Sequence, residues 1–238
     1  MKTRLDQQLA HRGLVTTRSQ AESYIKLGQV KVNAKVVTKP GFMVDETDDI
    51  KLLASEQYVS RAGLKLASVA QALKLDFKGK LMLDVGSSTG GFTDYALQHG
   101  AKKVIAVDVG TDQLHPSLRG DGRVELHEKT DIRDFKTDEN IDIIVIDVSF
   151  ISLREILPAV ARLAGPRTQI VAMAKPQFEA SQSDLKHKGV IKNDKMRRDI
   201  LKDFESWVKE QFIVIDKADS QVSGSKGNLE RFYLLRKA

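Results

Sequence analysis

Acidic residues end several apolar runs in the second half of the chain, at positions where carboxylates often bind ligands. Asp84 ends LMLDV, Asp108 lies near the end of KVIAVDV, and Asp147 lies near the end of IDIIVIDV. In open α/β sheets, ligands bind beyond the carboxyl ends of the strands, near the point where the strand order reverses. The first and fourth strands flank that point, so we expect Asp84 and Asp147 to face one crevice.

A glycine-rich turn follows the first of these runs, in LMLDVGSSTGGFTDYAL. Glycines let a ligand approach the backbone, and the next helix begins with free N–H groups. The spacing of Gly86, Gly90 and Gly91 departs from the G-x-G-x-x-G of dinucleotide enzymes and matches D-x-G-x-x-x-G-G, a loop that holds the methionine part of S-adenosylmethionine. The alternative is a tight turn without a ligand. The predicted cofactor-binding residues are Asp84, Gly86, Ser87, Ser88, Gly90, Gly91, Phe92, Asp108, Asp131 and Asp147.

Two of these carboxylates have predicted roles in binding the nucleoside part of the cofactor. Asp108 follows the glycine-rich turn by about twenty residues, which places it to bind ribose hydroxyls. Asp131, in EKTDIRD, follows the third strand-like run and is predicted to accept a hydrogen bond from the adenine amino group. Each is otherwise an ordinary aspartate at a strand end.

The residues after the fourth and fifth strands indicate which group accepts the methyl. The fourth strand is followed by Asp147-Val-Ser-Phe150, without the prolines of many enzymes that methylate base amino groups. The chain has no cysteine to act as a nucleophile on a pyrimidine carbon. Both observations favour a hydroxyl. A ribose 2′-hydroxyl is a poor nucleophile at neutral pH, and Lys175, directly after the fifth strand, is placed to handle its proton.

From residue 80 onward, strand-like runs alternate with helical segments. Nearly continuous apolar strands separated by helices predict a parallel sheet that is covered on both faces. The fold class is therefore α/β, a Rossmann-like sheet of seven strands with the last one antiparallel, as in methyltransferases. The expected strands are 81–85, 103–109, 123–128, 141–148, 168–174, 211–218 and 231–236. The expected helices are 60–75, 91–99, 152–164 and 195–209.

The first 44 residues are predicted to form a small α+β unit. One short helix ends near Gly13, and a second, capped by Thr17 or Ser19, ends at Gly28. QVKVNAKVV alternates apolar and polar residues around a tight turn, which is typical of a hairpin. Residues 45–58 are expected to add a last strand and a linker.

Positive charge is concentrated in this front segment. Residues 1–44 hold eight Lys/Arg and two Asp/Glu, a balance of +6 that equals the formal net charge of the whole chain. A basic segment on a neutral body indicates nucleic-acid binding, with a solvated basic surface as the alternative.

The second part of the chain resembles the ribose 2′-O-methyltransferases of the FtsJ type. The resemblance is carried by DVGSSTGGF, by the two strand-end residues Asp147 and Lys175, and by Glu230 in GNLERFYLL. It implies a catalytic Lys-Asp-Lys-Glu tetrad, in which VSRAGLKL supplies Lys65 as the first lysine. By this resemblance Lys175 is the base or proton relay, Asp147 orients it, and Lys65 and Glu230 position the ribose.

The front segment resembles the alpha-L RNA-binding domain of ribosomal small-subunit protein four, through RLDQQL, GLVTTRSQA, IKLGQVKVN and KPG. The order of the two domains, 1–58 and 59–238, resembles the TlyA family, often labelled hemolysin A. The resemblance implies a 2′-O-methylcytidine product in ribosomal RNA, in 23S rather than 16S. It also implies S-adenosylmethionine as cofactor and the ribosomal subunit as partner. The residues expected to face RNA are Arg4, Arg12, Thr17, Arg18, Gln20, Lys26 and Lys31.

Three other classes of protein fit the sequence less well. A haemolysin needs amphipathic hairpins or apolar spans, which we do not find in the sequence. An inactive RNA-binding protein does not explain the complete tetrad, and a nicotinamide oxidoreductase does not explain the glycine spacing. The chain is expected to be cytoplasmic and monomeric. No metal site is expected, because the five histidines lack the spacing of metal ligands. The basic run 186–198 is either a lid that contacts RNA or a solvated loop.

Overall fold

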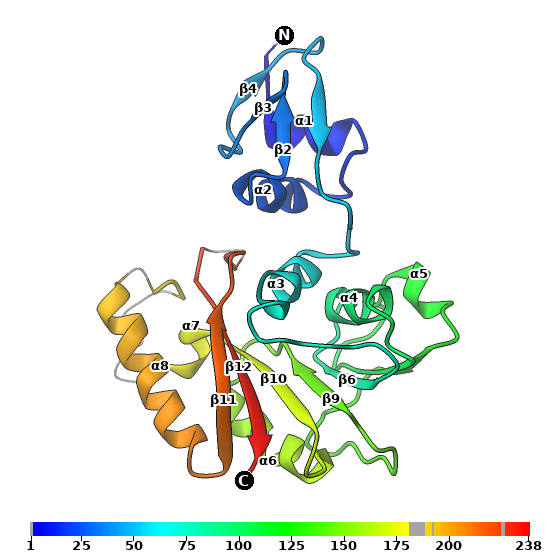
Figure 1. The fold of residues 1–238 in the computed structure, drawn as a ribbon, viewed down its shortest axis with the longest axis vertical. Coiled ribbons are helices and arrows are strands. Elements are labelled where there is room, and N and C mark those ends of the chain that lie inside the picture. The colour runs from blue at the N-terminus through cyan, green and yellow to red at the C-terminus, as the bar shows by residue number, and fades with distance from the viewer. Residues whose placement is uncertain (1, 181–188, 192, 225–226) are drawn as a thin grey trace.

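The computed structural model describes residues 2–180, 189–191, 193–224 and 227–238. The chain folds into a small front domain, which carries the elements β1 to β5, and a larger body, which carries α3 to β12 (Figure 1). The front domain has a two-stranded sheet, β1-β4, and a three-stranded sheet in the order β3-β2-β5. Its elements are β1 (Thr3–Arg4), α1 (Leu5–His11), α2 (Arg18–Lys26), β2 (Val30–Val32), β3 (Lys35–Val36), β4 (Met43–Val44) and β5 (Ile50–Leu52).

Local sequence explains the elements of the front domain. The Thr17 side chain accepts a hydrogen bond from the Gln20 N–H and so caps α2. Gly28 ends that helix region with a φ of 71°, a conformation that glycine adopts without steric cost. Asn33 and Ala34 both have positive φ, as the two central residues of a type I′ turn require. The predicted helices and hairpin are therefore found where the sequence indicated, and the β1-β4 pair is an addition.

The body contains the predicted seven-stranded sheet, in the order β11-β12-β10-β9-β6-β7-β8. Strands β10, β9, β6, β7 and β8 pair in parallel, and β12 is antiparallel to both of its neighbours. The predicted fold class is confirmed. The strands are β6 (Leu81–Val85), β7 (Lys103–Val107), β8 (Val124–His127), β9 (Ile143–Ile146), β10 (Gln169–Ala174), β11 (Phe212–Asp219) and β12 (Arg231–Lys237).

Helices cover both faces of this sheet. Apolar residues of α3 and α4 share one buried cluster with the sheet, and those of α6 and α8 share another. Phe204 is fully buried in the second cluster, and Trp207 packs against it. Two short helices, α5 and α7, were not predicted. The helices are α3 (Arg61–Ala70), α4 (Gly91–Gln98), α5 (Pro116–Arg119), α6 (Leu153–Leu163), α7 (Pro176–Glu179) and α8 (Asp194–Val208).

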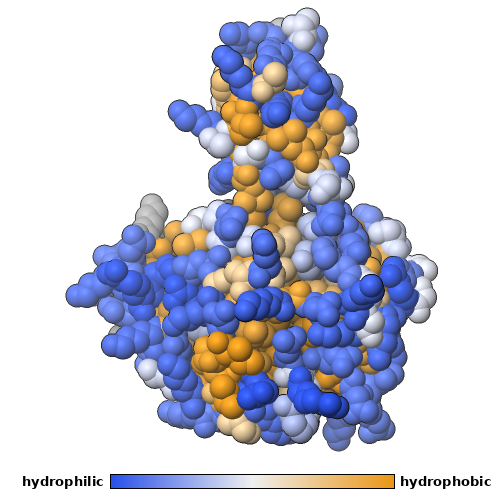
Figure 2. All heavy atoms as spheres, viewed as in Figure 1, coloured by the Kyte–Doolittle hydropathy of each residue, from blue (hydrophilic) through white to orange (hydrophobic). Residues whose placement is uncertain are grey.

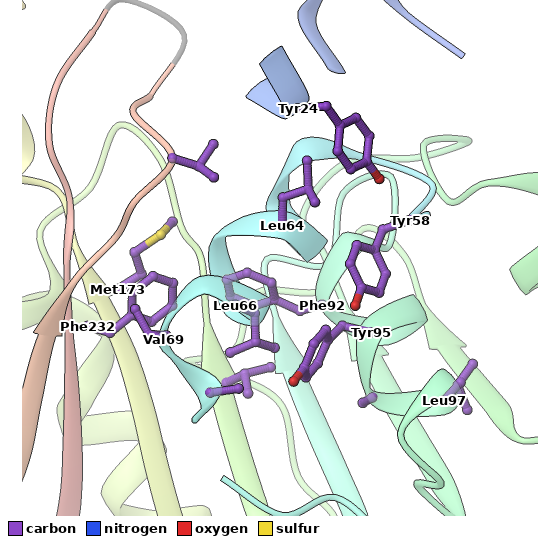
Figure 3. Close-up of a cluster of buried hydrophobic side chains, with 14 of the residues drawn as sticks. Tyr24, Tyr58, Leu64, Leu66, Val69, Phe92, Tyr95, Leu97, Met173 and Phe232 are labelled. Carbon is purple, nitrogen blue, oxygen red and sulfur yellow. The ribbon is translucent and has the colours of Figure 1, made fainter. Parts of the chain in front are cut away.

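The front domain and the body share a continuous apolar cluster. Tyr24 of α2, Tyr58 of the linker and Tyr95 of α4 belong to it and lie one below the other in Figure 3. The Tyr58 and Tyr95 rings are 5.4 Å apart, and the backbone N–H of Val59 donates to Asp94 of α4. Figure 2 shows hydrophobic residues at the neck between the two parts. The linker is therefore packed against the body.

Two glycines let α3 lie directly against α4. A Cβ on Gly63 would lie 2.5 Å from the Cβ of Tyr58, and one on Gly91 would lie 2.7 Å from the Gly63 backbone nitrogen. Such distances exclude a side chain at either position without a shift of the neighbouring elements. This contact fixes where α3 crosses the sheet, and with it the position of Lys65.

Candidate active site

Alternation along three strands brings the predicted catalytic residues to one face of the sheet. Side chains two residues apart on a strand point the same way. Val145, Met173 and Phe232 lie in the apolar cluster beneath α3. The alternation therefore directs Asp147, which follows Val145 by two residues, to that face. By the same reasoning, Lys175 follows Met173, and Glu230 precedes Phe232.

Strand register then places Lys175 beside Glu230. Ala174 of β10 pairs with Arg231 of the antiparallel β12, so the next position on each strand, Lys175 and Glu230, lies just beyond the paired region. Lys65 reaches this point from α3, a helix on the same face. The structure therefore brings together residues from widely separated segments of the chain.

The four residues form two buried ion pairs. The Lys175 ammonium lies 2.6 Å from Asp147 Oδ1, and the Lys65 ammonium lies 2.6 Å from Glu230 Oε2. Both contacts are ion pairs by distance, and Glu230 Oε2 has no hydrogen-bond partner among the described residues. Each lysine side chain is about nine-tenths buried, at 9% and 10% exposure. Charges this deeply buried are tolerated when they are paired.

Three residues that the sequence did not single out as site residues lie around Lys175. The ammonium donates a hydrogen bond of 2.7 Å to the Ser149 hydroxyl, in addition to its contact with Asp147. It also lies 6.0 Å from the centre of the Phe178 ring. Phe150 packs against Phe178 with its ring centre 5.4 Å away, yet 92% of Phe150 is exposed. An exposed phenylalanine with a positive φ of 66° is unusual in a globular protein. The sequence Asp147-Val-Ser-Phe150 alone did not indicate that Phe150 would be exposed and would have a positive φ.

A pocket of about 510 Å³ lies next to these residues, at the carboxyl ends of β6, β7 and β9. Apolar residues and a few polar groups line it, which is typical of sites for small molecules and cofactors. Five predicted cofactor-binding residues line this pocket: Gly86, Ser88, Asp108, Asp131 and Asp147. The other five, Asp84, Ser87, Gly90, Gly91 and Phe92, are buried behind it.

The carboxylates at the edge of the pocket are held by local hydrogen bonds. Asp108 accepts from the backbone N–H groups of Ser88 and Gly110, at 2.8 and 2.7 Å. Asp131 is held by Arg133, whose guanidinium approaches to 2.7 Å. Hydrogen bonds from Arg133 are the main reason that the pKa of Asp131 lies below its usual value. Both aspartates are therefore fixed in place, and Asp131 carries an arginine partner that the sequence did not indicate.

Asp84 lies at the bottom of the site and is fully buried. Burial raises its pKa to about 7, and the nearby charge of Asp147 adds to the effect, whereas a hydrogen bond from the Thr93 hydroxyl opposes it. Oxygen Oδ1 of Asp84 and Oγ of Ser87 are buried without a hydrogen-bond partner among the described residues. Unpartnered buried polar atoms are rare and often mark a place where a ligand or water completes the set.

The residues expected to face RNA fall into two groups. Arg4 and Arg18 each lie 2.9 Å from the fully buried Asp6, while about half of each arginine side chain remains exposed. Burial by itself would raise the pKa of Asp6, but hydrogen bonds from the two arginines bring it below the usual value. Lys26 is exposed and Lys31 half-buried, and neither has a described side-chain partner.

The remaining three make contacts inside the protein. Arg12 donates to the backbone carbonyl groups of Glu46 and Asp48 and so holds the loop before β5. Thr17 caps α2. Gln20 is buried at 2% exposure and donates to the backbone carbonyl of Tyr58 in the linker. All three side chains therefore make structural contacts. The sequence pattern indicated the cap at Thr17, but it did not reveal the contacts of Arg12 and Gln20.

Part of the basic run 186–198 lies outside the described residues, and Asp194–Val208 form α8. In the described part of the chain, no helix is both long and apolar enough to cross a bilayer. Within the same residues, no group of three His, Cys, Asp or Glu side chains is arranged to hold a metal ion.

The fold and the candidate site together indicate which class of protein this is. A doubly wound sheet with an antiparallel strand between β10 and β11, and a pocket at the strand ends beside buried lysines, is the architecture of Rossmann-like methyltransferases. The family model for FtsJ-like methyltransferases matches residues 58–237, and the model for the S4 domain matches residues 3–50. The chain belongs to the FtsJ-like methyltransferase family and carries an S4 domain at its front.

Individual relatives agree with this assignment. The chain is 43% identical over 190 residues to the 23S rRNA (cytidine-2′-O)-methyltransferase TlyA of Campylobacter jejuni, covering 79% of this chain and 74% of the relative. It is 39% identical to Hemolysin A of Brachyspira hyodysenteriae, covering 95% and 97%. A solved structure described as a "putative hemolysin" from Streptococcus thermophilus is 38% identical, with a TM-score of 0.73 and coverage of 100% and 89%.

Proposed function

We propose that this protein transfers a methyl group from S-adenosylmethionine to the 2′-hydroxyl of a cytidine ribose in ribosomal RNA, with 23S RNA as the preferred substrate. The observation that carries the proposal is the buried Lys175, held by Asp147 and Ser149 at the edge of the 510 Å³ pocket. A methyltransferase that acts on a hydroxyl needs a group to manage the proton of a weak nucleophile, and a positioned lysine is suited to this role.

The pocket fits the proposed cofactor. When bound, S-adenosylmethionine supplies an electrophilic methyl group on a sulfonium. Asp108 would accept hydrogen bonds from ribose hydroxyls, and Asp131 from the adenine amino group. The unpartnered atoms Asp84 Oδ1 and Ser87 Oγ lie behind the glycine-rich turn and are suited to bind the polar methionine end, directly or through water. A small set of polar groups in a largely apolar pocket matches what a nucleoside cofactor requires.

The geometry around Lys175 suggests how it handles the proton. After giving up one proton, the Lys175 amine would keep two N–H groups, which face Ser149 and Asp147, and would gain a lone pair for a substrate hydroxyl. In this neutral form Lys175 would hold the 2′-oxygen in line with the methyl group. It would take up the hydroxyl proton at Nζ as the oxygen–methyl bond forms and the methyl–sulfur bond breaks, which restores the ammonium paired with Asp147. Lys65 and Glu230, paired beside it, would position the ribose.

The exposed aromatic pair supports a nucleotide substrate. Phe150 presents its ring to solvent beside Lys175, and Phe178 supports it from below. Bases that are splayed out of single-stranded or flipped RNA stack on such aromatic rings. Phe150 is therefore placed to hold the base of the nucleotide whose ribose meets Lys175.

The S4 domain and the named relatives support ribosomal RNA as the substrate class. The first 44 residues, which form most of this domain, hold eight Lys/Arg and two Asp/Glu, and such a basic segment suits an RNA backbone. One relative is named for 23S RNA alone, and the TlyA protein of Mycobacterium tuberculosis is named for both 16S and 23S. The preference for 23S RNA over 16S RNA is therefore the more specific part of the proposal. A protein of this kind would work in the cytoplasm, where ribosomes are.

Methyl transfer to isolated ribosomal subunits tests the proposal. Labelled S-adenosylmethionine should label the large subunit, and the label should be recovered in dinucleotides that resist alkali, since a 2′-O-methyl group blocks cleavage. Lys175→Ala should lower the rate by about 10²- to 10⁴-fold, the usual contribution of general acid–base catalysis. Ser149→Ala should lower it less, and Ser149→Thr should restore part of the loss.

Because Lys175→Ala leaves Asp147 without its partner, cofactor binding and thermal unfolding of each variant serve as controls for folding. A wild-type protein that labels no RNA would refute the proposed function. A Lys175→Ala variant that labels as fast as wild type would instead refute the proposed role of the lysine.

A further inference from the structure

A small groove lies between the front domain and the body, beside the Lys65–Glu230 ion pair. It has a volume of about 70 Å³ and is lined by α2, by the start of α3 and by the segment between β11 and β12. In Figure 1, α2 lies above α3 and the upper end of the β11–β12 pair. Gly224 lines the groove, and a Cβ on it would lie 2.9 Å from Glu230 Oε1. The groove therefore adjoins the carboxylate that holds Lys65.

Two cations from different domains line this groove. Lys26 comes from the last turn of α2, and Arg61 from the first turn of α3. Neither side chain forms an ion pair or hydrogen bond with the rest of the described chain. The acidic residue in the groove, Glu22, lies 3.9 Å from Arg18, which offsets its charge. The groove thus keeps a positive charge that the described part of the protein does not neutralise.

Helical spacing relates Arg61 to the active site. Residues four apart on a helix lie on one face, with Cβ atoms about 5–6 Å apart. Arg61 and Lys65 have this spacing on α3, and Lys65 is paired with Glu230. A ribose held at Lys65 is bonded through its own 3′ and 5′ oxygens to phosphates. One of these phosphates can then approach a cation that lies one helical turn away on α3.

We propose that Arg61 and Lys26 form a phosphate-binding site for the RNA strand that enters the active site. The proposal rests on the proposed function, because it takes the ribose to lie at Lys65 and Glu230. The planar guanidinium of Arg61 can donate two parallel hydrogen bonds to phosphate oxygens, and Lys26 adds a point charge. Since the cations belong to different domains, the phosphate links the front domain to the body at the moment of substrate binding.

Binding of the full-length protein to unmethylated large ribosomal subunits, measured over a range of KCl concentrations, tests this site. Arg61→Ala and Lys26→Ala should each weaken binding about tenfold and reduce the slope of log K against log[salt] by about one. Arg61→Lys should retain part of the affinity. Affinity for S-adenosylmethionine should stay unchanged in all three variants. Arg167→Ala is the matched control, because Arg167 is exposed in the turn between α6 and β10 and has no described partner.

Unchanged affinity and slope in the two alanine variants would overturn the proposal, and so would a wild-type protein whose binding does not depend on salt. A rate of methylation that falls with no change in affinity or slope would also overturn it, because the residues would then act on domain arrangement. Binding is measured without methyl transfer. Its result is therefore separate from the failure of the proposed function, in which wild-type protein binds RNA but transfers no methyl group to it.

Discussion

Burial of the Asp84 carboxyl group should make the free energy of unfolding depend on pH. In the folded protein burial raises its pKa to about 7, whereas the unfolded chain has the ordinary value of 3.8. Between these pH values the folded state binds more protons than the unfolded state. The free energy of unfolding should therefore fall as pH rises from about 4 to about 7, and the contribution of Asp84 should be constant above that.

Asp84→Asn removes this titration and can keep a hydrogen bond with Thr93. We expect the melting temperature of this variant, relative to wild type, to increase from pH 5 to pH 8, as measured by circular dichroism. Asp112→Asn is the control, since the Asp112 side chain is 89% exposed. If the melting temperatures of the Asp84→Asn variant and wild type differ by the same amount at both pH values, Asp84 does not titrate as the structure indicates.

At the scale of elements, the contact between α3 and α4 decides where Lys65 lies. Both Gly63 and Gly91 are needed for this contact. A Cβ on Gly91 would meet Ser60 Oγ at 2.3 Å, and a Cβ on Gly63 would meet the Gly91 carbonyl oxygen at 3.0 Å. The sequence predicted both helices but gave no measure of the distance between them. The position of Lys65, a proposed active-site residue, thus depends on two glycines, which have no side chain.

Gly91→Ala should push α3 away from α4 and separate Lys65 from Glu230. Overpacking of this kind costs about 1–3 kcal/mol, which denaturant unfolding can measure, and we expect methyl transfer to fall at the same time. Gly122→Ala is the matched control, since no heavy atom lies within 4 Å of a Cβ at that position. Equal stability of the Gly91→Ala variant and the wild-type protein would mean that the two helices can separate at no cost.

For the whole molecule, the relevant property is the basic segment of residues 1–44, which belongs to a front domain that shares a core with the body. Removing residues 1–58 would expose Leu64 and Tyr95, which are buried in the shared cluster, so truncation tests folding as well as binding. Changing surface charge in the intact chain separates the two effects. Lysines of the front domain should matter for RNA, and an equal number on the body should not.

A triple lysine-to-glutamine variant of the front domain should bind ribosomal subunits at least tenfold more weakly at moderate salt, with unchanged affinity for the cofactor. A triple variant of the body with the same change in charge should bind like wild type. Filter binding and calorimetry measure the two affinities. Equal losses in both variants would indicate attraction by net charge alone. The front-domain set is Lys31, Lys35 and Lys39, and the body set is Lys74, Lys78 and Lys102.

Much of the fold could be predicted from the sequence because it depends on local patterns. Apolar runs such as IDIIVIDV form strands wherever they are buried on both faces, and Asp147 and Lys175 follow directly from their places at strand ends. The type I′ turn at Asn33 and Ala34 and the cap at Thr17 are likewise set by neighbouring residues. These features need no knowledge of distant segments.

The sequence by itself indicated a front unit and a body, the order of the strands and long helices of the body, and the types of residue at the strand ends. Only the tertiary structure decided that Lys65 meets Glu230, that Ser149 accepts from Lys175, and that Gln20 turns inward. The reason is physical. A strand or helix follows from interactions within a few residues, whereas a contact between distant segments depends on how closely whole elements pack, and that packing is settled by the complete core.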